Sequence, residues 1–201
     1  HTHLVFPYRG VYLRHVGSAQ AVADANHVLL FNADESYRVS HPVDGGDSSL
    51  TLDLGEALLH ELTPCALARG DGASGFRHQA LRIDARAQAL VALLRHALRH
   101  GSIEALEAES LALTLASRSL GPRTARTPGA THARQRLVDR AKLLLASDLG
   151  RRWTLADIAR EVGGSAVYLT QAFRQVEGMP LYRYQLQLRL ARALDLLASD
   201  I

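Results

Sequence analysis

The stretch that decides the fold of this chain is residues 154–173, TLADIAREVGGSAVYLTQAF. It begins with a helix start, because Thr154 is a good N-cap and Asp157 three residues later comes close to a capping box. Apolar residues then recur at helical spacing, at Leu155, Ile158, Ala159 and Val162. Gly163 and Gly164 follow, and glycine can leave a helix through a left-handed conformation that a side chain resists. The pattern predicts a short helix that ends in a tight turn.

A second helix is expected directly after this turn. Ser165 is a good N-cap for it. Its apolar positions are spaced to bury one face, at Leu169, Ala172, Phe173 and Val176. Two short helices joined by a tight turn are the pattern of a helix-turn-helix, which lays its second helix in the DNA major groove. An ordinary helical hairpin with glycine in its turn is the alternative interpretation.

The residues that follow are more specific. They form a series of Phe173-Arg174, Gly178-Met179-Pro180-Leu181, Tyr184, Leu188-Arg189-Leu190, Ala193 and Leu196-Leu197. This series resembles the DNA-binding domain of the AraC family of transcription regulators. The resemblance covers roughly residues 134–199 closely, and a weaker version of it extends through the first half of the chain.

The outer side of the second helix contains the predicted DNA-binding residues, which are Ser165, Ala166, Val167, Thr170, Gln171 and Arg174. The resemblance implies that Val167, Thr170 and Gln171 reach base edges, whereas Ser165 and Arg174 lie near phosphate. The chemistry agrees, because Gln can pair with adenine through two hydrogen bonds and Val can contact a thymine methyl group. Gln171 stands where many relatives carry Arg, which concerns the preferred base and not the mode of binding.

Charge is distributed unevenly along the chain. Residues 1–117 hold nine Arg and thirteen acidic residues, a net charge of −4, whereas residues 118–201 hold fourteen basic and seven acidic residues, a net charge of +7. A basic second part suggests that this part meets a polyanion. Alternatively, Arg is simply the favoured basic residue on solvated helix faces. That alternative explains the near absence of Lys but not the segregation of charge.

Short strands with turn signals dominate the first half. We expect two strands within residues 3–16 and further strands at residues 27–32, 36–40 and 48–54. Such a pattern predicts a small β-barrel or sandwich, and it resembles the cupin-type sensor domain that AraC-family regulators carry, in which an effector would bind. The chain opens inside the first strands of such a barrel, so we expect earlier residues to be missing.

Two helices are predicted after the strands. Asp84 caps the first and Gly101 ends it, while Ser102 is expected to cap the second. Together they predict an antiparallel hairpin. The resemblance implies that such helices often mediate dimerisation, so a homodimer is expected, with packing on the barrel alone as the alternative.

The sequence suggests a division into three parts. Residues 1–117 are predicted as the sensor domain with its dimerisation helices, 118–133 as a flexible linker and 134–201 as the DNA-binding domain. The helix at 134–148 is expected to bury one face and to carry Arg136, Arg140 and Lys142 on the other. The predicted fold class is α+β: a cupin-like N-terminal β-barrel with a helical hairpin, then an all-α helix-turn-helix domain. That domain has the bridging helix, residues 181–199, and lacks its second unit because the chain stops at Ile201.

Residues that would carry enzymatic chemistry do not form a recognisable pattern. Four histidines invite a metal interpretation, namely His1, His3, His27 and His41. No Glu follows as the enzymatic cupin pattern demands, so we interpret them as lining or edging the barrel, with no metal and no cofactor. Cys65, the single cysteine, is expected to be a small buried hydrophobe, and it excludes an intrachain disulfide.

The predicted function is that of a transcription regulator and not of an enzyme. Its expected partners are double-stranded DNA, a small-molecule effector in the barrel and a second copy of the chain. Its expected location is the cytoplasm, with no membrane span because no run of about 18 apolar residues occurs. Two alternatives remain open at this point: a metal-dependent cupin enzyme, and a truncated fragment that dimerises without binding DNA.

Overall fold

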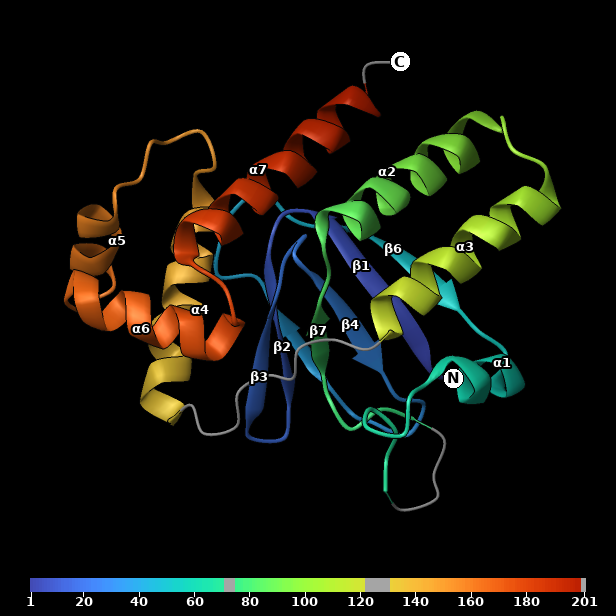
Figure 1. Cartoon of the computed structure of the whole chain (residues 1–201), viewed down its shortest axis with the longest axis horizontal. Helices are drawn as coiled ribbons and strands as arrows, with labels where there is room; N and C mark the ends of the chain where they lie inside the picture. The colour runs from blue at the N-terminus through green and yellow to red at the C-terminus, as the bar shows by residue number, and fades with distance from the viewer. Residues whose placement is uncertain (71–74, 122–130, 200–201) are drawn as a thin grey trace.

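The computed structural model describes residues 1–70, 75–121 and 131–199 of the chain. The strands of this part are β1 (His3–Arg9), β2 (Tyr12–Val16), β3 (Ala19–Ala23), β4 (His27–Phe31), β5 (Arg38–Ser40), β6 (Ser48–Asp53) and β7 (Ala80–Arg82). Its helices are α1 (Glu56–Leu62), α2 (Ala85–His100), α3 (Ala105–Leu120), α4 (His132–Ser147), α5 (Leu155–Glu161), α6 (Ala166–Glu177) and α7 (Leu181–Leu197) (Figure 1). Over the described ranges, none of these helices combines the length and the apolar character needed to cross a membrane.

The described strands form two antiparallel sheets, with the strand orders β6-β1-β4-β7 and β3-β2-β5. The α+β class is therefore confirmed, but the closed barrel is wrong, because no ladder between described strands joins the two sheets. The chain changes sheets at Gly10, which has a φ of 74°, so β1 and β2 do not pair as a hairpin. A Cβ at Gly10 would lie 2.0 Å from the carbonyl oxygen of Gly46, so this crossing has no room for a side chain.

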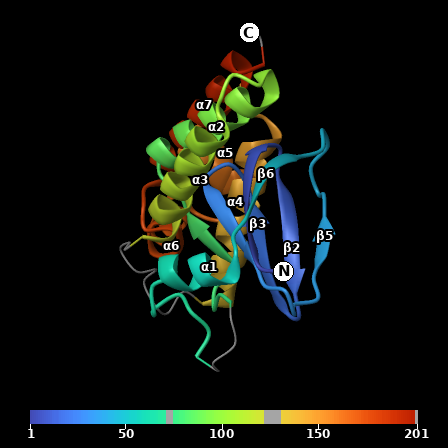
Figure 2. The ribbon, with the colours of Figure 1, turned by 90° about the vertical axis from the view of Figure 1, so that its right-hand side faces the viewer.

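The four-stranded sheet lies in the middle of a layered N-terminal half. Leu4, Phe6 and Leu30 on one face pack against Val91 of α2 and Leu115 of α3. The alternate residues of the same strands face the three-stranded sheet and pack with it in a second cluster: Val5, Leu29, Phe31, Tyr12 and Ala23. This alternation follows from the two-residue period of a strand. Figure 2 shows the layers from the side, with α2 and α3 on one side of β1 and β6 and with β2 and β5 on the other.

Several local expectations for the N-terminal half change in the structure. β3, α1 and β7 were not predicted, and each has seven residues or fewer. Ser102 does not cap α3: its N–H donates to the carbonyl oxygen of Ala97, 3.1 Å away, and so closes the end of α2, while Glu104 precedes α3. Cys65 is exposed in the turn after α1, so its predicted burial is wrong.

Helices α4 to α7 pack around a second apolar core. Its fully buried members come from all four helices and include Val138, Ala141, Ile158, Leu169, Phe173 and Tyr184. α3 reaches Leu120 and α4 begins at His132, so both ends of the predicted linker 118–133 are helical, and residues 122–130 lie outside the described ranges.

The two halves of the chain also pack against each other. The second half of α7 lies beside α2 (Figure 1). There the buried guanidinium of Arg95 donates to the carboxylate of Asp195 and stacks 4.0 Å from the ring centroid of Tyr8. The predicted sensor and DNA-binding parts are therefore joined by a buried polar contact as well as by the chain.

Candidate nucleic-acid interface

The start of α5 has the predicted cap. The N–H of Asp157 donates to Thr154 Oγ1 over 3.1 Å, and the N–H of Thr154 donates to Asp157 Oδ2 over 3.2 Å, which completes a capping box. The hydrogen bond from the Thr154 hydroxyl lowers the pKa of Asp157. Ile158, Ala159 and Val162 are buried as expected, whereas Leu155 in the first turn is 40% exposed.

A tight turn joins α5 to α6. Gly163 has a φ of 72°, in the left-handed region, and the N–H of Gly164 donates back to the carbonyl oxygen of Ala159 over 2.8 Å. The next residue, Ser165, caps α6 by accepting a hydrogen bond from the N–H of Tyr168 over 3.2 Å. These contacts fix the direction of α6 relative to α5 through residues close in sequence.

One face of α6 is buried and the opposite face is open. The buried residues are the predicted ones, Leu169, Ala172, Phe173 and Val176. On the other side Val167 is 68% exposed, and Ser165, Gln171 and Arg174 are also exposed. Val167, Gln171 and Arg174 follow one another at steps of four and three residues, so they lie along one face of the helix. Helix α6 itself lies beside α5, at the end of the molecule remote from α2 and α3 (Figure 1).

Two of the predicted DNA-binding residues lie closer to the protein. Ala166 is half-buried and packs against the helical core. Thr170 is half-buried too, and its hydroxyl donates to the carbonyl oxygen of Ala166 over 2.9 Å. The Thr170 hydroxyl proton is therefore used in a hydrogen bond within the helix. The Thr170 side chain can still accept a hydrogen bond at Oγ1 and make apolar contact through its methyl group.

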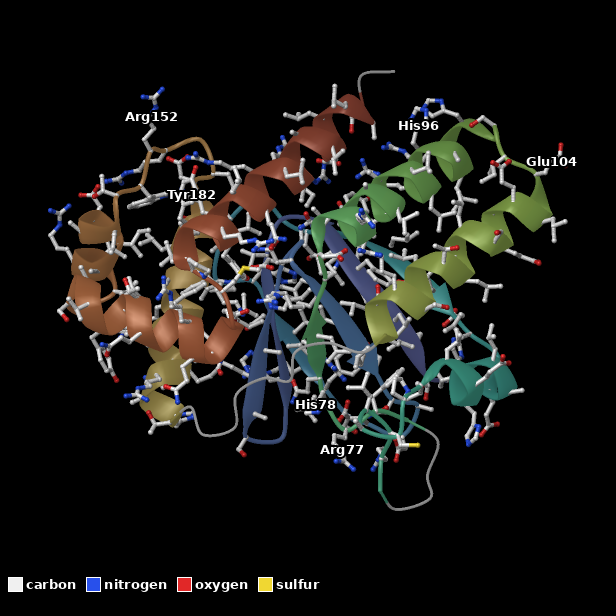
Figure 3. All side chains as sticks on the ribbon, viewed as in Figure 1. Arg77, His78, His96, Glu104, Arg152 and Tyr182 are labelled. Atoms are coloured by element: carbon white, nitrogen blue, oxygen red, sulfur yellow. The ribbon has the colours of Figure 1, made fainter. Side chains whose placement is uncertain are left out.

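Several arginines lie on α4, on α5 and in the loop between these helices. Arg134 at the start of α4 donates to Gln175 of α6, and its guanidinium carbon lies 5.8 Å from the ring centroid of Tyr168. Arg160 of α5 is exposed and pairs with Asp157 over 2.9 Å. In the loop ahead of α5, Arg152 projects outward from the molecule (Figure 3). The outer face of α4 carries Arg136 and Arg140, both exposed as predicted.

Lys142 is not on that outer face, and this corrects the sequence-based expectation. Its side chain is 5% exposed, and Lys142 Nζ lies 2.7 Å from Glu177 Oε1 and 3.4 Å from His27 Nε2. His27 Nδ1 lies 2.8 Å from Asp24 Oδ1. Lys142 follows Val138 by four residues, which places it on the buried side of α4. That spacing was the signal that sequence reasoning missed.

The buried cluster of Asp24, His27, Lys142 and Glu177 contains shifted titratable groups. Burial alone would raise the pKa of Glu177, but the ammonium group of Lys142 and the hydrogen bond with His27 outweigh it and hold this pKa low. Burial would lower the pKa of Lys142, but the carboxylates of Glu177 and Asp24 raise it. Burial and Lys142 would lower the pKa of His27, yet Asp24 raises it above its usual value.

Further bonds extend this cluster between the two halves of the chain. The Tyr184 hydroxyl of α7 donates to Asp24, and Asn26 Nδ2 donates to the carbonyl oxygen of Tyr184 over 3.1 Å. Arg82 of β7 donates to the carbonyl oxygen of Glu177 at the end of α6. The N-terminal half therefore contacts Glu177, in the last turn of α6, at both its side chain and its backbone carbonyl oxygen.

The four histidines singled out in the sequence do not share one role. His27 belongs to the buried cluster between the halves and does not line a barrel. His41 Nε2 lies 2.7 Å from Asp47 Oδ1. His1 and His3 lie with Asp53 in a group whose potential ligand atoms are all within 4.8 Å of one another.

Side chains occupy the space between the two sheets, where an effector was expected. Arg14 is fully buried there and donates to the carbonyl oxygen of Leu30 over 2.8 Å and to the carboxylate of Glu35. Its guanidinium carbon lies 3.9 Å from the ring centroid of Phe31. A buried Arg inside a strand was not predicted, because strand alternation does not distinguish it from an exposed one.

The chain was compared with known proteins. No protein-family model matches it, and neither does any curated protein. Among solved structures it is similar to a variant of apo ToxT from Vibrio cholerae, with 9% identity, a TM-score of 0.42, and coverage of 93% of this chain and 89% of that chain. It is also similar to the AraC-like transcriptional activator CuxR, with 17% identity, a TM-score of 0.41, and coverage of 99% of this chain and 72% of that chain.

Proposed function

We propose that this chain is a DNA-binding transcription regulator that reads sequence in the major groove with α6. The observation that carries the proposal is the open face of α6, where Val167, Gln171 and Arg174 are exposed while the opposite face is buried. A helix fixed by a capped partner helix and a tight turn, with a free polar face, is suited to enter a groove. The sequence series that resembles AraC-family DNA-binding domains supports the same interpretation.

Each exposed residue has a role that its chemistry allows. The amide of Gln171 can pair with adenine through two hydrogen bonds, and Val167 can contact a thymine methyl group. Thr170 supplies an acceptor and a methyl group from beside them. Arg174 and the backbone at Ser165, where α6 begins, are placed for phosphate oxygens. Ala166 permits close approach of the DNA backbone because it has a small side chain.

The positive charge of the C-terminal part of the chain favours DNA as the partner. The part of the chain from residue 118 onward has a net charge of +7. Within it Arg136, Arg140, Arg152 and Arg160 are exposed. Neutralising phosphates releases counterions, so affinity is expected to fall steeply as salt concentration rises.

The test is fluorescence anisotropy on a duplex selected by this chain from a pool of randomised sequences. We expect Gln171→Ala to weaken binding to the selected duplex by about 1–3 kcal/mol and to relax preference at one base position. Arg174→Ala should instead weaken binding to all duplexes and reduce the slope of log affinity against log salt by about one. Arg183→Ala is the matched control, because Arg183 is exposed on α7 and its substitution changes the charge equally.

The result that would contradict the proposal is equally clear. If no duplex is enriched and none binds at low salt, the chain does not read DNA by itself. If Arg183→Ala matches Arg174→Ala in both affinity and salt slope, binding depends on net charge and not on the face of α6.

We also infer that a second copy of the chain packs on α2 and α3. Exposed leucines occur on both helices, at Leu93, Leu98, Leu106 and Leu113. Leu106 is 79% exposed and Leu98 is 52% exposed, so a second copy that covered the two helices would remove apolar surface from water. Light scattering should show a dimer that Leu106→Glu dissociates, and a monomeric wild-type chain would contradict this inference.

A further inference from the structure

Two histidines and an aspartate meet at one end of the four-stranded sheet. β1 and β6 are antiparallel, and His3 is directly opposite Asp53 in their register. His1 lies just ahead of β1, and its ring centroid is 5.9 Å from that of His3. The potential ligand atoms of His1, His3 and Asp53 are all within 4.8 Å of one another. Strand pairing therefore brings together residues about fifty positions apart in sequence.

The His3 ring is held in place before any ligand arrives. It stacks on the ring of Phe31, with 4.9 Å between the centroids and an angle of 7° between the planes. His3 Nδ1 lies 3.0 Å from the carbonyl oxygen of His1, so Nδ1–H donates there. That bond fixes the tautomer and leaves the lone pair on Nε2, which is the arrangement usual for a metal-ligating histidine.

Asp53 is placed to complete a set of three ligands. Its Oδ1 lies 3.0 Å from His1 Nε2. Both side chains are well exposed, at 60% and 77%, so a hydrated ion reaches them without moving the core. An exposed pair such as His1 and Asp53 contributes little to the free energy of folding. Both side chains can therefore exchange this contact for a bound metal ion at little cost.

We propose that His1, His3 and Asp53 form a binding site for a divalent transition-metal ion of the zinc type. Two imidazole nitrogens and one carboxylate oxygen suit such an ion, and three protein ligands leave a coordination position for water or another ligand. The site lies on the N-terminal sheet, and the proposal does not depend on DNA binding by α6.

A second histidine–aspartate pair shows what distinguishes this site. His41 Nε2 lies 2.7 Å from Asp47 Oδ1, closer than His1 lies to Asp53. Among the residues that the structure describes, however, no third His, Cys, Asp or Glu completes a ligand group around that pair. His41 therefore provides a matched control with the same partner chemistry but one ligand fewer.

The experiment is calorimetric titration of the folded chain with Zn²⁺, with Co²⁺ as a spectroscopic probe of coordination. The chain should carry one additional residue ahead of His1, so that a terminal amino group next to His1 does not supply a ligand. We expect one ion per chain. His3→Gln and Asp53→Asn should each weaken binding more than about tenfold, the loss seen when even an outer partner of a metal ligand is removed. His41→Gln should leave the affinity unchanged.

Three results would overturn the proposal. They are no binding of Zn²⁺, binding that survives Asp53→Asn and His3→Gln, and binding that His41→Gln weakens as much as they do. Thermal unfolding without metal checks that each variant folds. Added Zn²⁺ should raise the melting temperature of the wild-type chain and not that of Asp53→Asn, because a ligand that binds only the folded state stabilises it.

Discussion

Glu177 at the end of α6 forms a buried ion pair with Lys142. Its carboxylate is 7% exposed and its principal partner, Lys142 Nζ, lies 2.7 Å away. Glu177→Gln keeps the shape but leaves the Lys142 charge buried without its main counter-charge. We expect the free energy of unfolding to fall by about 3–5 kcal/mol, the usual cost of breaking a buried ion pair from one side.

Urea unfolding measures this change, and an exposed pair supplies the control. Arg160 and Asp157 pair over 2.9 Å with side-chain exposures of 69% and 28%. Arg160→Gln should therefore cost less than about 1 kcal/mol. Equal effects of the two substitutions would show that the Lys142–Glu177 pair is not buried in solution.

His27 should make stability depend on pH. Burial and Lys142 oppose its protonation, but Asp24 raises the pKa of His27 above its usual value. The folded state thus holds the His27 proton more tightly than the unfolded state does. This stabilisation is complete below the unfolded pKa of about 6.5 and is lost as pH rises through the folded pKa.

We expect the free energy of unfolding, measured in urea, to decrease as pH rises above about 6.5, by at most about 1.4 kcal/mol per pH unit for one proton. His27→Gln should flatten this decrease, and His41→Gln should not. The lowered pKa values of Asp24 and Glu177 give the opposite limb, because protonating them in acid removes their stabilisation. A decrease above pH 6.5 that persists in His27→Gln would assign it to another group.

The turn between α5 and α6 is the element on which the proposed DNA-reading geometry depends. Gly163 has a φ of 72°, and a Cβ built there meets nothing within 4 Å. The effect of Gly163→Ala is therefore backbone strain alone, about 1–2 kcal/mol for an L-residue in the left-handed region. A loss of this size in thermal or urea unfolding is expected, together with weaker DNA binding as α6 shifts.

The neighbouring glycine tests that reasoning. Gly164 does not have a positive φ, and its Cβ would lie 3.5 Å from Leu137 Cδ1, an ordinary contact distance. Gly164→Ala should be neutral or slightly stabilising, because it reduces the entropy of the unfolded chain. If both substitutions cost the same, the left-handed conformation at Gly163 is not what shapes the turn.

Elements set by local chemistry could be predicted from the sequence, whereas those set by distant contacts could not. The Thr154 and Ser165 caps are predictable because a cap bonds within three residues of itself. Ser102 is an exception, because α3 begins after Glu104, two residues later than its sequence predicts. Strands β1 and β2 were predicted, but their assignment to different sheets depends on the close approach at Gly10, which no local pattern reveals.

The proposed DNA-binding face followed from periodicity, whereas the cluster behind it did not. Val167, Gln171 and Arg174 are exposed because Leu169, Phe173 and Val176 must be buried, which a helical period predicts. The pairing of Glu177 with Lys142 and His27 requires three elements that are far apart in sequence. Hydrophobic periodicity places every charged residue at the surface. It therefore cannot predict that charged residues from different elements are buried together.

At the scale of the whole molecule, the buried polar contacts oppose the picture of two independent domains on a tether. Asp24, Asn26 and Arg82 of the N-terminal half bond to Tyr184 or Glu177 of the C-terminal half. A buried donor or acceptor that loses its partner without gaining water costs free energy. Partial separation of the two halves is therefore unfavourable. The proposed regulator would therefore present α6 in a fixed orientation relative to its sheets.

This picture predicts one cooperative unfolding transition, and the position of Trp153 allows a direct test. The single tryptophan packs against the helical core of the C-terminal half, whereas far-UV circular dichroism reports on both halves. The urea transitions seen by tryptophan fluorescence and by dichroism should coincide in the wild-type chain.

Asp195→Asn leaves Arg95 buried without its counter-charge where α7 meets α2. We expect this variant to lose about 3–5 kcal/mol of stability or to separate the two transitions, with the tryptophan signal changing first. Arg183→Ala, an exposed substitution on the same helix, should do neither. Wild-type transitions that already differ would mean that the halves unfold independently, and α6 would then be free to reorient on DNA.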